Sequence, residues 1–160
     1  MDTIRVIFIK HSLWNLPSTA IRLGLPHSLI HLGLSSHSLI VDGDYAIEAK
    51  MLFLDNGKIR TGIRRVLLSE ALVGATIIKD VSFKVPYAEA GLIWARAQVG
   101  KPYDFKGAFA LFLVPNRNWQ EDNSWYCYEL VAAAIHNSGR KLFNDLGHIT
   151  GRELLGVNPE

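Results

Sequence analysis

The sequence predicts an α+β domain in which an antiparallel sheet comes first along the chain and helices follow it. Strand-like segments fill the first half: an apolar run at 1–10, two β-prone stretches around residues 42–43, and further stretches at 61–67 and 75–85. Helical patterns come afterwards. Strands followed by clustered helices are typical of α+β folds. Because the chain has 160 residues and no repeat or linker, we expect a single domain over residues 1–160.

The N-terminal segment 1–10 is predicted to be a buried strand and not a secretory signal, because its apolar stretch is short and lacks a cleavage site. No apolar run approaches the roughly 18 residues of a membrane-spanning helix. The longest, at 108–114, is expected to be a core helix or a groove wall, and 12–25 an irregular or helical stretch. We therefore expect no transmembrane segment, and a protein that acts in the cytoplasm or leaves the cell by another route, for example in a virion or by lysis.

The dipeptide Asp42-Gly43 predicts a β-hairpin over 37–42 and 44–50. It lies between β-prone runs, and a type I′ turn needs residues that tolerate positive φ at both central positions. With this turn, His37 lies directly opposite Glu48. Directly opposed residues have Cβ atoms about 4.5–5.5 Å apart, so Glu48 is positioned to hold one imidazole nitrogen.

Two alternatives remain for His37. If the turn lies one residue later, at Gly43-Asp44, the residue facing His37 is Lys50 instead of Glu48. His37 is otherwise a half-exposed strand residue without a role. Spacing alone does not decide between these interpretations, because the register of a short hairpin depends on which residues form the turn.

The only cysteine, Cys127, lies where a helix is predicted to begin. Ser124 is a suitable N-cap, because its hydroxyl can accept a hydrogen bond from a backbone N–H of the first turn. Cys127 then takes the third helical position, where the helix dipole favours the nucleophilic thiolate. The helix is predicted to end near Gly139. The alternative is a buried, inert packing residue, which is common for a lone cysteine on an apolar helix stripe.

Another helix is predicted to open at Pro86, since a missing N–H costs nothing in the first turn, and to end at Gly100. Asp104 is expected to cap the apolar helix that follows. The residues expected on one face of the helix after Pro86 are Ala90, Ile93, Trp94 and Ala97.

Composition excludes several classes of site. The formal net charge is +2, and the basic residues Lys58, Arg60, Arg64 and Arg65 alternate with Ile59, Ile63 and Val66. This pattern favours the solvated face of a strand, and no nucleic-acid surface is expected. One cysteine excludes an intramolecular disulfide, and His27, His31 and His37 lack the companions of a zinc site. We expect neither metal nor cofactor, and the sequence sets no oligomeric state.

The order of the chemically active residues resembles a known family. His37 is followed one hairpin later by an acidic residue, and Cys127 at a helix start is followed by Glu-Leu-Val. The run Gly-Lys-Pro-Tyr-Asp-Phe at 100–105 lies between them, with a weaker echo at 149–155. This ordered set is similar to the circularly permuted NlpC-type papain-like proteins. The YiiX/YaeF branch is the closest, and the lecithin retinol acyltransferase group is more distant.

The resemblance implies a circularly permuted papain-like fold with Cys127 as nucleophile, His37 as base and Glu48 as the residue that orients the base. It also implies a substrate groove lined by Tyr103, for which the alternative is a packing aromatic without a role in the groove. The predicted groove includes the neighbouring aromatics Trp125 and Tyr128. The sequence departs from the family at two places: Tyr128 stands where the family usually has serine, and Leu39 where it usually has a small residue. These changes affect the groove and leave the reacting groups in place.

The expected function is a cysteine hydrolase that cleaves an amide of a cell-wall peptide, or an acyl ester, through a thioester. The aromatic-rich region of Trp119, Trp125, Tyr126 and Tyr128 would suit an acyl chain. The expected partner is therefore a peptide or acyl substrate. Two alternatives stay open: a lipid acyltransferase, and a non-enzymatic binding or structural protein that keeps the fold with an idle site.

Overall fold

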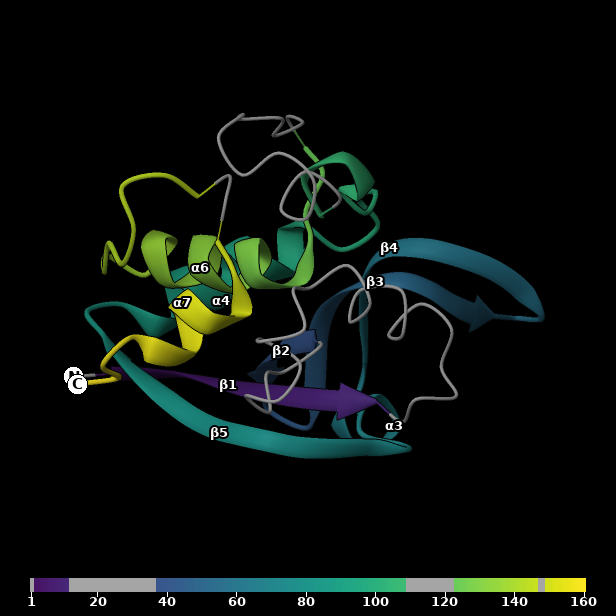
Figure 1. The fold of residues 1–160 in the computed structure, drawn as a ribbon, viewed down its shortest axis with the longest axis horizontal. Helices are drawn as coiled ribbons and strands as arrows, with labels where there is room; N and C mark the ends of the chain where they lie inside the picture. Colours follow the sequence, from purple (N-terminus) through teal and green to yellow (C-terminus); the bar gives the residue numbers. More distant parts are fainter. Residues whose placement is uncertain (1, 12–36, 109–122, 147–148) are drawn as a thin grey trace.

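The computed structural model describes residues 2–11, 37–108, 123–146 and 149–160, and the fold of these residues is drawn in Figure 1. The expectations for 12–25, for most of 108–114 and for His27, His31 and Trp119 lie outside the described residues.

Within the described ranges, five antiparallel strands form one sheet in the order β4-β3-β2-β1-β5. The strands are β1 (Asp2–His11), β2 (His37–Asp42), β3 (Tyr45–Asp55), β4 (Lys58–Leu67) and β5 (Ala75–Val85). The predicted α+β class with an antiparallel sheet is thus confirmed.

The turn between β2 and β3 lies at Gly43-Asp44, one residue later than predicted, because Asp42 pairs with Tyr45 as the last pair of the ladder. Gly43 has φ +61°, so the residue that tolerates positive φ occupies the first turn position. The buried carboxylate of Asp42 accepts hydrogen bonds from Arg65 Nε at 2.8 Å and Arg96 Nη2 at 2.6 Å. These long-range contacts hold Asp42 in the strand, which the dipeptide pattern does not reveal.

The helices are α3 (Leu68–Ala71), α4 (Ala88–Ala97), α6 (Cys127–Asn137) and α7 (Gly151–Gly156). A further helix begins at Phe105, and Asp104 caps it as predicted by accepting a 2.7 Å hydrogen bond from the Gly107 N–H. No helix among the described residues has the length and apolarity needed to cross a membrane.

The buried face of α4 differs from the prediction. Its buried residues are Gly91 and Ala95. Of the residues predicted on the buried face, Ile93 is 57% exposed, and Ala90 and Ala97 are exposed as well. A Cβ added at Gly91 would lie 2.5 Å from the carbonyl oxygen of Ala134 in α6. Close approach of the two helix backbones therefore selects the face of Gly91 and Ala95, and Leu92 and Trp94 are partly buried against the same core.

The helices α4, α6 and α7 cover one side of the sheet (Figure 1). On this side, alternate strand residues such as Phe8, Ile40 and Ile47 pack with Leu130 and Val131 of α6. The intervening residues form a second cluster with Ala71 of α3, which contains Ile7, Ile9, Leu39 and Ala46. This alternation follows from the two-residue period of a strand, and both faces of the central strands are buried.

Candidate active site

Helix α6 begins at Cys127 itself, so the cysteine is the first helical residue and not the third. Tyr126 is the N-cap, with extended dihedral angles φ −99° and ψ 170°, in place of the predicted Ser124. Trp125 forms a parallel bridge with Tyr103, which keeps the chain extended up to the helix. The other end matches the prediction, because α6 ends at Asn137 and Gly139 follows with φ +89°.

Two sets of contacts fix the start of α6. The hydroxyl of Tyr126 donates to the Ile149 carbonyl at 3.1 Å and accepts from the Ile149 N–H at 2.9 Å. The Asp104 N–H donates to the Trp125 carbonyl at 3.1 Å. The first residue of α6 is therefore held from both sides by chain segments distant in sequence.

The segment 100–104 is in turn attached to the edge of β4. The Ile63 N–H donates to the Lys101 carbonyl at 2.9 Å, and the Gly100 N–H donates to the Ile63 carbonyl at 2.9 Å. Gly62 permits this approach, because a Cβ at that position would lie 2.4 Å from the Lys101 oxygen. The sheet thus sets the position of Cys127 through the 100–104 segment.

His37 and Glu48 are in contact, with Nε2 and Oε2 2.5 Å apart. They are not directly opposed as predicted, because the ladder of β2 with β3 ends at the pair Ile40–Ile47 and the Cα partner of His37 is Ile9 of β1. Moving the turn by one residue shifts the pairing register by two, so both side chains stay on the same face. The side chain of Glu48 then spans the remaining distance.

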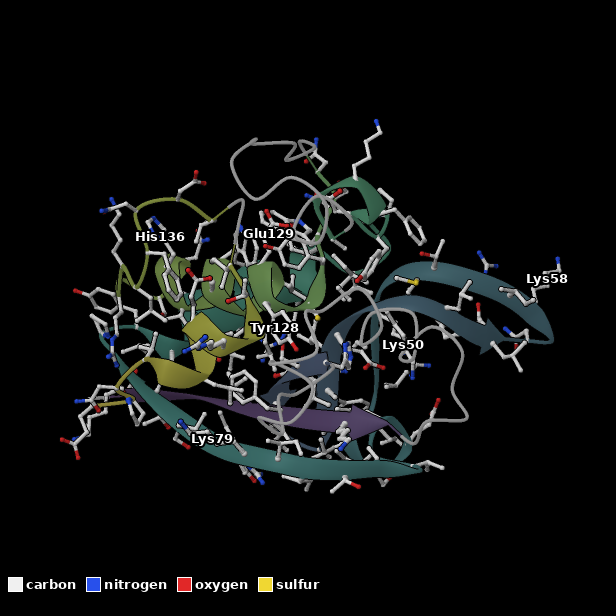
Figure 2. The ribbon with its side chains drawn as sticks, viewed as in Figure 1. Lys50, Lys58, Lys79, Tyr128, Glu129 and His136 are labelled. Carbon is white, nitrogen blue, oxygen red and sulfur yellow. The ribbon has the colours of Figure 1, made fainter. Side chains whose placement is uncertain are left out.

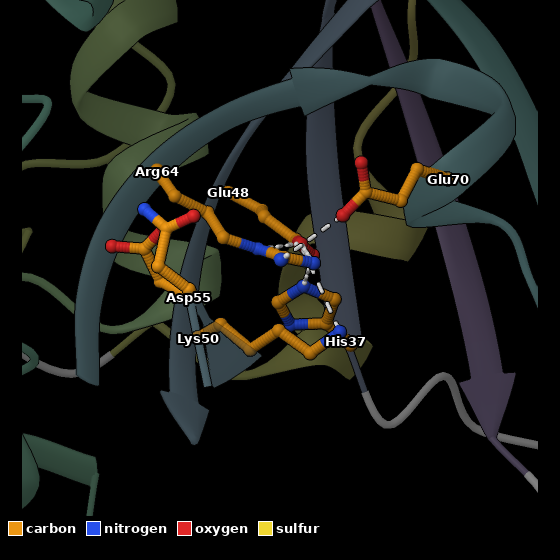
Figure 3. A network of polar contacts seen from close by, with 7 residues as sticks. His37, Glu48, Lys50, Asp55, Arg64 and Glu70 are labelled. Atoms are coloured by element: carbon orange, nitrogen blue, oxygen red, sulfur yellow. Dashed lines mark hydrogen bonds and ion pairs between the residues drawn. The ribbon is translucent and has the colours of Figure 1, made fainter. Parts of the chain in front are cut away.

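Arg64 is a member of the site that the sequence pattern did not predict. It lies directly opposite Glu48 in the β3–β4 ladder and donates to Oε1 from Nε at 2.8 Å and from Nη2 at 2.6 Å. Figure 3 shows Glu48 between Arg64 and His37, with the Lys50 amino group 3.9 Å from the same carboxylate. The Arg64 side chain is only 12% exposed, so its predicted place on a solvated face is wrong.

The electrostatic environment favours the charged forms of His37 and Glu48. Burial lowers the pKa of His37, but hydrogen bonds to Cys127 and Glu48 outweigh it and raise this pKa to about 9. Burial also opposes ionisation of Glu48, but the hydrogen bond to His37 and the charges of His37, Lys50 and Arg64 lower its pKa to about 2. An imidazolium–carboxylate pair therefore persists across the neutral range.

The structure brings Cys127, His37 and Glu48 together. The thiol of Cys127 is a side-chain hydrogen-bond partner of His37. The ring nitrogen Nε2 of His37 faces the Glu48 carboxylate. Cys127 is 6% exposed, so the sulfur lies at a buried helix start with the imidazole beside it. A thiol, a base and a carboxylate in this order form the arrangement used in nucleophilic catalysis by cysteine.

The three predicted groove residues lie in different surroundings. Tyr103 is buried, and its pKa is raised, first by burial. The Trp125 ring packs edge-on against Trp94 with centroids 5.1 Å apart. Tyr128, labelled in Figure 2, is half-buried and lies against Gly151 of α7.

Comparisons with known proteins find no match: no family model, no curated protein and no solved structure matches the chain. Within the described residues, no group of three or more His, Cys, Asp and Glu side chains is arranged to hold a metal ion. The geometry around Cys127 is therefore the feature of the molecule that points to a function.

Proposed function

We propose that the protein is a thiol hydrolase with a circularly permuted papain-like fold, which cleaves an amide or an acyl ester through a thioester. One observation carries the proposal: the imidazole of His37 contacts both Glu48 and Cys127, and Cys127 is the first residue of a helix. A nucleophile with an adjacent base, which is itself oriented by a third group, is the general pattern of covalent acyl transfer.

In the first half-reaction, the Cys127 thiolate attacks the carbonyl carbon and forms a C–S bond. The His37 imidazolium gives its proton to the leaving nitrogen or oxygen as the C–N or C–O bond breaks. In the second half-reaction, His37 takes a proton from water, whose oxygen attacks the thioester carbon, and the C–S bond breaks to return the thiolate. Glu48 keeps the ring in place and stabilises the imidazolium in both steps.

The helix start supplies hydrogen-bond donors for the oxyanion of the tetrahedral intermediate. The first intrahelical hydrogen bond runs from the Leu130 N–H to the Tyr126 carbonyl at 3.0 Å, so the Cys127 N–H lies before it. The N-cap Tyr126 provides no side-chain acceptor to the first turn. Backbone N–H groups at an uncapped helix start are suited to stabilise developing negative charge.

A peptide amide of the cell wall is the first candidate substrate, and an acyl ester, including one transferred to a lipid acceptor, is the second. A panel of peptidoglycan stem peptides and short-chain acyl esters tests the proposal, with release of a free amine or acid as the readout. We expect Cys127→Ser and His37→Ala each to abolish turnover, and Glu48→Gln to reduce it less, because Glu48 does not react itself. His136→Ala and Glu89→Gln, at exposed positions, serve as matched controls and should retain turnover.

Thiol reactivity separates the enzyme from a fold that keeps an idle site, a candidate favoured by the burial of Cys127. With an imidazolium beside the sulfur, folded protein should react with iodoacetamide at pH 6 faster than a free thiol does, and His37→Ala should slow the reaction. His136→Ala should leave the rate unchanged. Labelling that occurs only in denaturant would identify Cys127 as a packing residue and would remove the hydrolase proposal.

A further inference from the structure

The outer part of the β3–β4 hairpin carries exposed aliphatic side chains. Residues 51–60, here called the distal hairpin, extend beyond the helices that cover the rest of the sheet (Figure 1). Leu54 and Ile59 form a cross-strand pair on it and are 72% and 74% exposed. Leu52 is about half-exposed. Among the described residues, no helix reaches this part of the ribbon.

The distal hairpin is amphipathic. Leu52 lies in the bulge between Lys50 and Phe53. It is exposed like Leu54, whereas residues 51, 53 and 55 are half-buried, so we assign Leu52 to the same face as the Leu54–Ile59 pair. The opposite face carries the pairs Phe53–Arg60 and Asp55–Lys58. A two-stranded ribbon with one aliphatic face and one mainly polar face is suited to an interface between water and an apolar phase.

The polar side chains add a positive charge. Arg60 forms an ion pair with Asp55 at 2.9 Å, which neutralises the one acid of the ribbon. Lys58 lies at the far end of the hairpin (Figure 2), and no carboxylate of the described residues forms an ion pair with it. The net charge of the distal hairpin is therefore positive and lies on the face opposite its aliphatic side chains, and a positive charge favours an anionic lipid surface over a neutral one.

We propose that the distal hairpin docks on an anionic phospholipid bilayer, with Leu52, Leu54 and Ile59 at the acyl boundary and Lys58 among the headgroups. Three aliphatic side chains on a ten-residue ribbon are fewer than the roughly 20–30 residues per side that a specific protein interface uses, so a bilayer fits better than a protein partner. Docking does not depend on the proposed hydrolase activity. It would hold the first half of β3, with Glu48, and the second half of β4, with Arg64, close to the membrane.

Co-sedimentation with vesicles tests the proposal. Wild-type protein should bind mixed phosphatidylcholine–phosphatidylglycerol vesicles, bind pure phosphatidylcholine vesicles less, and release as salt is raised. Ile59→Asp should lower the partition coefficient by about tenfold or more, because it places a charge at the acyl boundary. Ile93→Asp is the matched control, since it makes the same substitution at an exposed position of α4, and should bind as wild type does. Lys58→Gln should weaken binding to the mixed vesicles alone.

Thermal unfolding of each variant checks that the fold is retained, and Leu54→Ser gives a milder change if Ile59→Asp does not fold. The proposal is overturned by a wild type that does not bind mixed vesicles, or by equal losses for the two Ile→Asp variants. It is also overturned by a wild-type dimer in analytical ultracentrifugation that Ile59→Asp dissociates, because the occupant is then a second copy of the chain.

Discussion

At the scale of single residues, the feature that sets this site apart is the pairing of the Glu48 carboxylate. Glu48 is fully buried, with His37 on one oxygen and Arg64 on the other. A buried carboxylate is strongly destabilising unless it is paired and hydrogen-bonded. Arg64 therefore acts as a positioning residue, which keeps Glu48 ionised and leaves its second oxygen aimed at His37.

Arg64→Gln should destabilise the protein by about 3–5 kcal/mol, because it leaves Glu48 buried with fewer cationic partners. It should also raise the pKa of Glu48, since the charge of Arg64 lowers it. Urea unfolding at pH 7 measures the first effect, and NMR titration of the Glu48 carboxyl measures the second. Arg60→Gln, whose ion pair is exposed, should cost less than about 1 kcal/mol. Equal costs for the two variants would contradict the assigned role of Arg64.

At the scale of elements, the attachment of segment 100–104 to β4 connects the sheet to the start of α6. Gly62 is the weak point of this attachment, with φ +125° and the Lys101 oxygen 2.4 Å from the place of a Cβ. The bridge between Tyr103 and Trp125 connects this segment to the chain just before Cys127. A substitution in β4 that displaces the 100–104 segment is therefore expected to displace the Cys127 sulfur as well.

Gly62→Ala should cost more stability than Gly57→Ala. Both glycines have positive φ, so both substitutions incur backbone strain of about 1–2 kcal/mol. Only Gly62 adds a clash with the 100–104 segment, because nothing lies within 4 Å of a Cβ at Gly57. Chemical denaturation gives the two stabilities, and iodoacetamide labelling shows whether Cys127 has moved. If Gly57→Ala lowers the stability as much as Gly62→Ala does, the close approach of Gly62 to the Lys101 oxygen does not explain the glycine at this position.

At the scale of the whole molecule, the buried His37–Glu48 pair makes stability depend on pH. The pKa of His37 is raised from 6.5 to about 9, so its contribution is complete below pH 6.5 and is lost as the pH rises through 9. The pKa of Glu48 is lowered from 4.5 to about 2, so its contribution is complete above pH 4.5 and is lost as the pH falls through 2.

The melting temperature should consequently be highest between pH 4.5 and 6.5 and should fall towards pH 9. Calorimetry across this range measures the profile. Glu48→Gln should flatten the alkaline side, because His37 loses the partner that raises its pKa, whereas His136→Ala should preserve the wild-type profile. A melting temperature that rises from pH 6.5 to 9 would show that His37 is not held as a buried imidazolium.

Local patterns predicted the order of the elements and several of their ends. The strand predicted at 75–85 is β5 with the same bounds, α6 ends next to Gly139, and Asp104 caps the helix that follows it. The strand depends on the alternation of apolar and polar residues. The helix ends depend on residue types with a local preference: glycine after a helix and aspartate before one. Both are properties of short stretches of chain, and the sequence contains them directly.

Other features of the fold depend on contacts between segments that are distant in the sequence. Arg65 and Arg96 hold Asp42 in β2, so the turn lies one residue later than predicted. The bridge from Tyr103 to Trp125 keeps the chain extended, so α6 begins later in the sequence than predicted. His37 and Glu48 meet through side-chain reach, because the turn shift preserved their common face. Arg64 is buried because Glu48 lies opposite it, a pairing set by the next hairpin. Ion pairs and close backbone approaches have no fixed spacing along a chain, so only the folded arrangement reveals them.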